Sequence, residues 1–171
     1  MFEVGEVALR SYRSEDLAVF RRLAELYAYD FSELTGRAVH ADGLFLDETQ
    51  FASLFPLDDC DTYLIEADGA LAGFAMVAKT GMLSGEAGGY DMQQFMVLRA
   101  YRRCNVGTRA AVALFERYPG QWEVRQMVEN HPAQHFWRRV IGAYTAGRFS
   151  EARISHPDGD QVVQRFDSRR S

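Results

Sequence analysis

The stretch YRRCNVGTRAAVALF (residues 101–115) places two arginines and a short turn immediately before an alanine-rich amphipathic run. The run predicts a helix that begins near Val106, because its apolar residues recur on one helical face. A helix N-terminus presents unpaired N–H groups and the positive end of the helix dipole, and both favour anions. Gly107 adopts positive φ freely, and Asn105 tolerates it better than most residues. The stretch therefore predicts a turn that holds a pyrophosphate between a strand and a helix.

The segments on either side of this turn predict a mixed fold. Ser14 is a preferred N-cap residue, Asp68-Gly69 is a favoured hairpin turn, and Gly142 suits the end of the last helix. The expected strands cover residues 6–12, 62–67, 70–79, 90–98, 122–128, 148–155 and 162–168, and the expected helices cover residues 14–31, 106–118 and 131–142, with a short helix between residues 35 and 56. A glycine-rich loop is expected over residues 81–89. The prediction is an α/β (α+β) fold in the order β-α-(α)-β-β-β-α-β-α-β-β, forming a single domain over residues 1–171.

Composition narrows the class of protein. A chain of 171 residues with 47% hydrophobic residues is long enough to bury a full core. The net charge of −5 disfavours nonspecific nucleic-acid binding. No apolar run approaches the roughly 20 residues of a membrane helix, and the N-terminus lacks a signal-peptide pattern. Cys60 and Cys104 stand too far apart to indicate a disulfide framework or a metal knuckle. We therefore expect a soluble, cytoplasmic protein that binds neither nucleic acid nor membranes.

Charge is distributed unevenly along the chain. Between Tyr27 and Asp61 there are eight Asp or Glu residues, and Arg37 is the only Lys or Arg. Around the opening stretch the balance reverses, with five arginines: Arg99, Arg102, Arg103, Arg109 and Arg117. One interpretation is two regions built for ligands of opposite sign. The other is that both are solvated faces.

At the turn the sequence resembles the GNAT acyl-CoA acyltransferases. RRCNVG (residues 102–107) matches their [R/Q]-x-x-G-x-[G/A] signature, except that Asn105 replaces the first glycine. FMVLRAYRR (residues 95–103) is similar to the strand whose backbone pairs with the pantetheine arm, and ENHPAQHFWRRVIG (residues 129–142) to the family's second region. The resemblance implies a mostly antiparallel central sheet flanked by helices, with acetyl-CoA as co-substrate. It implies coenzyme contacts from Phe95, Met96, Val97, Arg102, Arg103, Cys104, Asn105, Val106, Gly107, Thr108 and Asn130. For Asn130 two alternatives remain open, capping of backbone groups at the start of the following helix or contact with the pantetheine.

Catalytic groups are less clearly marked. Many members of the family place a tyrosine general acid where this chain has Trp137, and an indole is no practical proton donor to a thiolate. Tyr144 is the nearest substitute, with a buried core tyrosine as the alternative, and Tyr90 is a weaker candidate. Glu86 and Asp91 flank the strand on which family members often carry a carboxylate base. Gln93 or Gln94 is a candidate for holding a water there, and simple exposure is the alternative for each.

No metal site is expected. His131 and His135 lie four residues apart, but HPAQH lacks the glutamate base of zinc proteases and has no evident third ligand. The leading functional hypothesis is an N-acetyltransferase that moves an acetyl group from acetyl-CoA to a cationic primary amine by direct attack. The acidic region from Tyr27 to Asp61 suggests the charge of this amine acceptor, which is a small molecule or a peptide. The alternative is a non-catalytic acyl-CoA-binding or sensing module, and the expected assembly is a monomer or homodimer.

Overall fold

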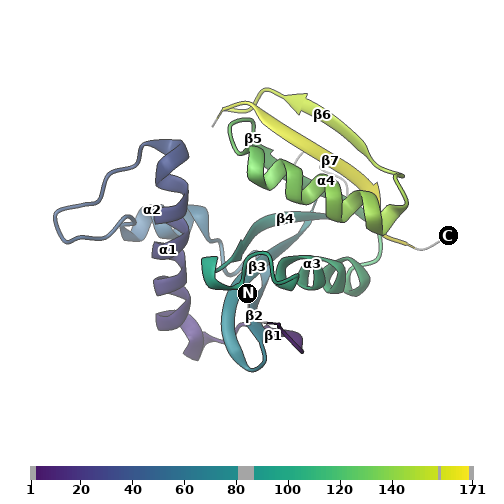
Figure 1. Ribbon diagram of the computed structural model, residues 1–171. Helices are drawn as coiled ribbons and strands as arrows, with labels where there is room; N and C mark the ends of the chain where they lie inside the picture. The colour runs from purple at the N-terminus through teal and green to yellow at the C-terminus, as the bar shows by residue number, and fades with distance from the viewer. Residues whose placement is uncertain (1–2, 81–86, 158, 170–171) are drawn as a thin grey trace.

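The computed structural model describes residues 3–80, 87–157 and 159–169 (Figure 1). Its strands form a seven-stranded sheet in the order β1-β2-β3-β4-β5-β7-β6. The strands are β1 (Val7–Ser11), β2 (Cys60–Ala67), β3 (Ala70–Thr80), β4 (Ala87–Val97), β5 (Gln121–Met127), β6 (Ser150–Ile154) and β7 (Gln161–Asp167). Neighbouring strands run antiparallel, except that β4 and β5 are parallel. The mixed, mostly antiparallel sheet expected from the sequence is confirmed.

Helices cover both faces of this sheet. They are α1 (Leu17–Thr35), α2 (Glu48–Leu54), α3 (Val106–Arg117) and α4 (His131–Thr145), with short 3-10 turns η1 (Ser14–Asp16) and η2 (Arg99–Tyr101). One core cluster packs the α3 and α4 residues Leu114 and Ile141 against Ile65 and Val77 of the sheet. The other packs the α1 and α2 residues Phe20 and Phe51 against Leu64 and Phe74. Because adjacent strand residues point to opposite faces, the continuous apolar runs of β2 and β3 supply both clusters.

Several expected boundaries were wrong. Ser14 does not cap the first helix; it begins η1, and the carboxylate of Asp16 accepts a hydrogen bond from the Arg13 backbone N–H. Gly142 does not end α4, which continues to Thr145. The chain turns after this helix through Ala146 and Gly147, both at positive φ. The last three residues of the expected glycine-rich loop belong to β4. The predicted type of each element and their order along the chain are otherwise confirmed.

The sheet divides where β4 leaves β5. These two strands pair only at Gly89↔Gln121, Tyr90↔Trp122 and Asp91↔Glu123. The β3–β4 register shifts at the same level, because Met76 pairs with Gln94 while Val77 pairs with Met92. Gln93 is therefore the extra residue of a β-bulge, and such a bulge bends its strand and increases its twist. We call the gap that opens between β4 and β5 beyond Asp91 the fork.

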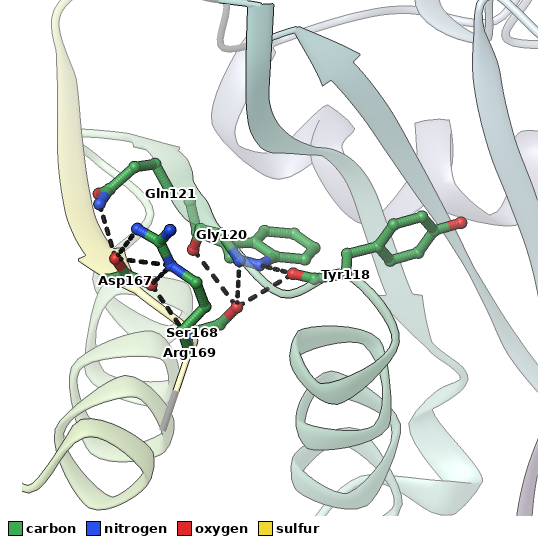
Figure 2. Close-up of polar contacts among 7 residues, drawn as sticks. Tyr118, Gly120, Gln121, Asp167, Ser168 and Arg169 are labelled. Carbon is green, nitrogen blue, oxygen red and sulfur yellow. Dashed lines mark hydrogen bonds and ion pairs between the residues drawn. The ribbon is translucent and has the colours of Figure 1, made fainter. Parts of the chain in front are cut away.

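At the end of β5 away from the fork, residues 167–169 form hydrogen bonds with one another and with residues 118–121 (Figure 2). Ser168 is buried, and its Oγ donates to the Tyr118 carbonyl at 3.0 Å and accepts from the Gly120 N–H at 3.0 Å. Trp122 Nε1 donates to the same Tyr118 carbonyl at 2.9 Å. Asp167 accepts hydrogen bonds from Gln121 and Arg169. These contacts satisfy backbone groups in the connection from α3 to β5 that would otherwise be buried without partners.

Candidate functional site

The turn before α3 has the backbone shape of an anion site. Arg103 has φ of 65° and Asn105 has φ of 62° and ψ of 4°, so both occupy the left-handed region. The sequence-based expectation that Asn105 occupies this region is confirmed. Alternation of left- and right-handed residues turns successive N–H groups toward one side, which is how backbone nests bind anions. The turn also ends at the N-terminus of α3, whose dipole adds to the same preference.

Gly107 does not supply the positive φ that we expected of it. It lies inside the first turn of α3. A Cβ at this position would lie 3.2 Å from two ring carbons of Phe136 and 3.4 Å from a methyl group of Val97. Packing therefore favours glycine here, because it lets the start of α3 approach both β4 and α4 closely. The sequence pattern located the turn but not the reason for its glycine.

Most arginines near the turn have partners inside the protein. Arg102 forms an ion pair with Asp30 of α1, and its Nε donates to the Val97 carbonyl at 2.8 Å. Arg99 Nε donates to the same Asp30 carboxylate at 2.8 Å. Arg109 donates hydrogen bonds to the carbonyls of residues 4 and 5, and the guanidinium of Arg117 lies 4.9 Å from the Tyr63 ring centre.

Arg103 is exposed, and no ion pair joins it to another described residue. It is therefore the cation of this stretch most available to a bound phosphate.

The strand leading into the turn has one edge open. Beyond Asp91, β4 pairs with β3 and no longer with β5 among the described residues, so the β4 edge at Phe95, Met96 and Val97 faces the fork. Phe95 and Val97 pack in the cluster on the α3 and α4 side, whereas Met96 is buried on the α1 and α2 side. The Phe95 ring lies 6.0 Å from the Phe136 ring and 5.0 Å from the Trp137 ring, measured between centres. An extended ligand arm along this edge would find backbone groups beside aromatic walls.

The remaining expected coenzyme residues lie around the same helix starts. Val106 is fully buried, and Cys104 and Thr108 are half-buried beside it. Asn130 precedes α4, and its Oδ1 accepts from the Ala133 N–H at 3.2 Å. That contact is the capping role, one of the two alternatives that the sequence left open for Asn130.

Of the two carboxylate bases expected from the sequence, the structure describes only Asp91. Glu86 lies outside the described residues. Asp91 is fully buried, and both of its carboxylate oxygens accept from Arg125, at 3.0 and 2.8 Å. Burial raises the pKa of the Asp91 carboxyl, and the Arg125 guanidinium opposes that shift. Gln94 is also engaged, because its side chain accepts from Tyr27 and donates to the Leu54 carbonyl.

The candidate proton donors lie in packed surroundings. Tyr144 is part of α4; its ring lies 5.3 Å from that of Phe115, and its hydroxyl donates to the Ser168 carbonyl at 3.1 Å. Ser168 marks the end of the sheet away from the fork, so the structure does not bring Tyr144 to the turn before α3. Tyr90 packs at 5.2 Å from the Tyr118 ring. Trp137 is 5% exposed and belongs to the core.

Many of the acids between Tyr27 and Asp61 have structural partners. Asp30 pairs with two arginines, Asp47 caps α2, and Glu48 pairs with Arg21. Asp61 accepts from Tyr118 and pairs with Lys79 at 3.0 Å. Burial raises the pKa of Asp61, but the hydrogen bonds from Tyr118 and Lys79 outweigh burial and leave this pKa below its usual range.

Beside Asp61 the surface is hollowed. The hollow has a volume of about 310 Å³ and is lined by Ser11, Tyr12, Leu57, Cys60, Asp61, Thr62 and Tyr63. Burial, with neighbouring carboxylates, raises the pKa of the Cys60 thiol to about 11, so the thiol is protonated near neutrality. Asp58 and Asp59 are exposed next to this hollow along the chain. Glu33 of α1 is exposed as well, so Asp58, Asp59 and Glu33 are acids of the region that remain open to a ligand.

Two important residues were missed by sequence analysis. Asp30 was counted only as one of many acids, and Arg125 only as part of an alternating strand. The alternation of WEVRQMV does indicate that Arg125 points away from Trp122 and Val124. Its partner depends on the register between β4 and β5, which no local pattern encodes.

Within residues 3–80, 87–157 and 159–169 no group of three or more His, Cys, Asp or Glu side chains is placed to hold a metal ion. In the same residues no helix has the length and apolar character needed to cross a membrane.

Comparison with known proteins shows the family and agrees with the fold. The family model of the acetyltransferase (GNAT) family matches residues 21–143. No curated protein matches the sequence significantly. Among solved structures, aminoglycoside acetyltransferase AAC(6')-Ib in complex with coenzyme A has a TM-score of 0.65 and 18% identity, covering 95% of this chain and 95% of that one. The ribosomal-protein-S18-alanine N-acetyltransferase from Escherichia coli has a TM-score of 0.59 and 19% identity, covering 97% and 96%. A spermidine N-acetyltransferase chimera from Vibrio cholerae and hSSAT has a TM-score of 0.61 and 13% identity, covering 96% of each chain.

Proposed function

The chain belongs to the acetyltransferase (GNAT) family, and we propose that it transfers an acetyl group from acetyl-CoA to a cationic primary amine. The observation that carries the proposal is the continuity of the open β4 edge with the turn at Arg102–Asn105 and the N-terminus of α3. An extended thioester arm fits the edge, and its phosphates fit the turn. Phe95, Met96 and Val97 would flank the arm, and Arg103 would supply the cation nearest the phosphates.

The reaction that we propose is direct attack. The neutral amine attacks the thioester carbonyl carbon, forming the C–N bond of the amide as the C–S bond breaks. The amine loses one proton, and the leaving thiolate gains one. Backbone N–H groups of the open β4 edge are suitable donors to the developing oxyanion, and binding both reactants in one cleft supplies proximity. With the Tyr144 hydroxyl bonded to Ser168, solvent is our proposed source of the thiolate proton.

The cationic character of the acceptor rests on charge. The chain has a net charge of −5, and Asp58 and Asp59 remain exposed beside the hollow. Such carboxylates raise the local concentration of cations and disfavour anionic substrates. The three named relatives act on an aminoglycoside, a ribosomal-protein alanine and spermidine, so the amine class within this fold varies. The acceptor here is proposed as a small molecule or peptide that carries a positive charge.

A panel of cationic and anionic amines tests the proposal, with detection of the free thiol released from acetyl-CoA. We expect release with cationic amines and a kcat/KM that falls at higher salt, because screening weakens the attraction. A preference for anionic amines would refute the cationic acceptor. Binding of acetyl-CoA without thiol release across the panel would favour the sensing module, an alternative with which the packed positions of Trp137 and Tyr144 agree.

A further inference from the structure

The ion pair between Arg125 and Asp91 spans the place where β4 and β5 separate. Asp91 is the last β4 residue paired with β5, opposite Glu123. Arg125 lies two residues further along β5, where the strands no longer exchange backbone hydrogen bonds. Its Nε and Nη2 donate to the two carboxylate oxygens of Asp91 at 3.0 and 2.8 Å. A side-chain contact thus joins the two strands where backbone pairing ends.

The same guanidinium also reaches the bulge. Arg125 Nη2 donates to Gln93 Oε1 at 3.4 Å, and Gln93 is the extra residue by which β4 bends. One arginine of β5 therefore contacts the last paired residue and the bulged residue of β4. A two-atom contact with a planar guanidinium fixes direction as well as distance, which a lysine cannot do. We call Arg125, Asp91 and Gln93 the fork brace.

Burial makes the ion pair between Arg125 and Asp91 costly to break. The Asp91 side chain is 0% exposed and that of Arg125 is 11% exposed. A buried carboxylate that loses its partner is strongly disfavoured, so the two strands cannot shift apart or together without breaking a costly pair. A simple surface ion pair would exert far less control over strand geometry.

From this arrangement we infer that Arg125 and Asp91 are positioning residues, which hold the fork at the width that the thioester arm of acetyl-CoA requires. The inference rests on the proposed function, because it assigns the open β4 edge to that arm. It gives Asp91 a role distinct from that of a general base, since both of its oxygens are used in holding Arg125. Misalignment of backbone donors by a fraction of an ångström at the reacting end is expected to weaken binding of the arm while leaving the distant phosphate turn intact.

Measurements with two ligands distinguish a local defect at the fork brace from general damage to the fold. Acetyl-CoA occupies both the edge and the turn, whereas adenosine 3',5'-bisphosphate carries only the nucleotide end. We expect Arg125→Met to weaken acetyl-CoA binding about tenfold or more in calorimetry, with affinity for adenosine 3',5'-bisphosphate unchanged within about twofold. Because Arg125→Met leaves a buried carboxylate without its guanidinium, the double variant Asp91→Leu/Arg125→Met is measured as well. Apolar replacement of a buried pair commonly preserves folding.

Arg165→Met is the matched control. Arg165 Nε donates to Glu123 Oε1 at 3.0 Å, and Glu123 is the register partner of Asp91 and is itself buried. This pair joins β7 to β5 and does not cross the fork, so its removal should leave both affinities unchanged. The inference is overturned if the folded double variant binds acetyl-CoA as tightly as the unmodified chain, loses both ligands equally, or is matched by Arg165→Met. If the unmodified chain itself fails to bind acetyl-CoA, that result contradicts the proposed function, and with it the inference.

Discussion

At the scale of single residues, the two adjacent arginines in the turn before α3 contribute differently. Asn105 and Arg103 supply the left-handed backbone, and Arg103 is also an exposed cation that no ion pair joins to another described residue. Arg102, which the family signature emphasises, is held by Asp30 and by the Val97 carbonyl. The two neighbouring arginines therefore have different roles despite their identical chemistry.

This difference gives a prediction for acetyl-CoA affinity. Arg103→Ala should weaken binding by about 1.5–3 kcal/mol, the usual contribution of a hydrogen bond to a charged group. Arg102→Ala should have the smaller effect, because its guanidinium must leave Asp30 before it can bind a phosphate. Calorimetry at two salt concentrations measures both, and the salt dependence should decrease more in Arg103→Ala. An equal loss in the two variants would show that Arg102 exchanges Asp30 for phosphate without cost.

At the scale of elements, α4 is anchored to the end of β5 by the side chain of its N-cap residue and by a side chain of its own first turns. Asn130 caps the helix through Ala133, and Gln134 Nε2 donates to the carbonyls of Met127 and Val128 at 3.0 and 2.9 Å. These bonds satisfy backbone groups at the junction of a strand and a helix. They also set where Phe136 and Trp137 stand relative to β4.

Asn130→Ala should lower the free energy of unfolding by about 0.5–2 kcal/mol, the usual range for loss of an N-cap. Asn130→Asp keeps the accepting oxygen and serves as the control, so it should stay close to the unmodified chain. Urea unfolding gives the stability and calorimetry gives the acetyl-CoA affinity. If Asn130→Ala binds acetyl-CoA much more weakly but unfolds normally, Asn130 contacts the coenzyme rather than the helix.

Local sequence patterns were sufficient to predict the helices, strands and turns, but not the tertiary contacts that their side chains make. The Asp68-Gly69 turn was predictable because only a few residue pairs accept positive φ at both positions, here 49° and 77°. The left-handed Asn105 was predictable for the same reason. The ion pairs of Arg102 with Asp30 and of Arg125 with Asp91 join residues 72 and 34 positions apart, and each depends on tertiary packing. The expected role of Gly107 failed on the same ground, because its neighbours Phe136 and Val97 belong to other elements.

At the scale of the whole molecule, acid stability depends on carboxylates tied to arginines. Asp16 accepts from both Arg10 Nη atoms, at 2.9 and 3.0 Å, and from the Arg13 backbone N–H. The Arg10 hydrogen bonds, followed by the Arg13 bond, lower the pKa of Asp16 in the folded state. A lowered folded pKa means that the stabilisation is present above the unfolded value of about 3.9 and is lost as the pH falls through the folded value.

Asp16→Asn should therefore reduce the free energy of unfolding near neutral pH and make little difference at a pH well below the folded value. Urea unfolding at pH 7 and in strong acid gives the comparison. Asp59→Asn, at an exposed position, removes the same charge without these partners and should change stability little at either pH. A constant difference between Asp16→Asn and the unmodified chain at all pH values would show that ionisation of Asp16 does not matter.

The two core clusters on opposite faces of the sheet have different optical properties. The chain has two tryptophans, and both Trp122 and Trp137 belong to the cluster beneath α3 and α4. The cluster beneath α1 and α2 contains none. Intrinsic tryptophan fluorescence therefore reports on one side of the sheet only, whereas far-ultraviolet circular dichroism reports on all helices. Coincidence of the two unfolding curves would mean that the sheet couples its two faces into one cooperative unit, although in the described residues the backbone pairing of β4 with β5 is limited to three residue pairs.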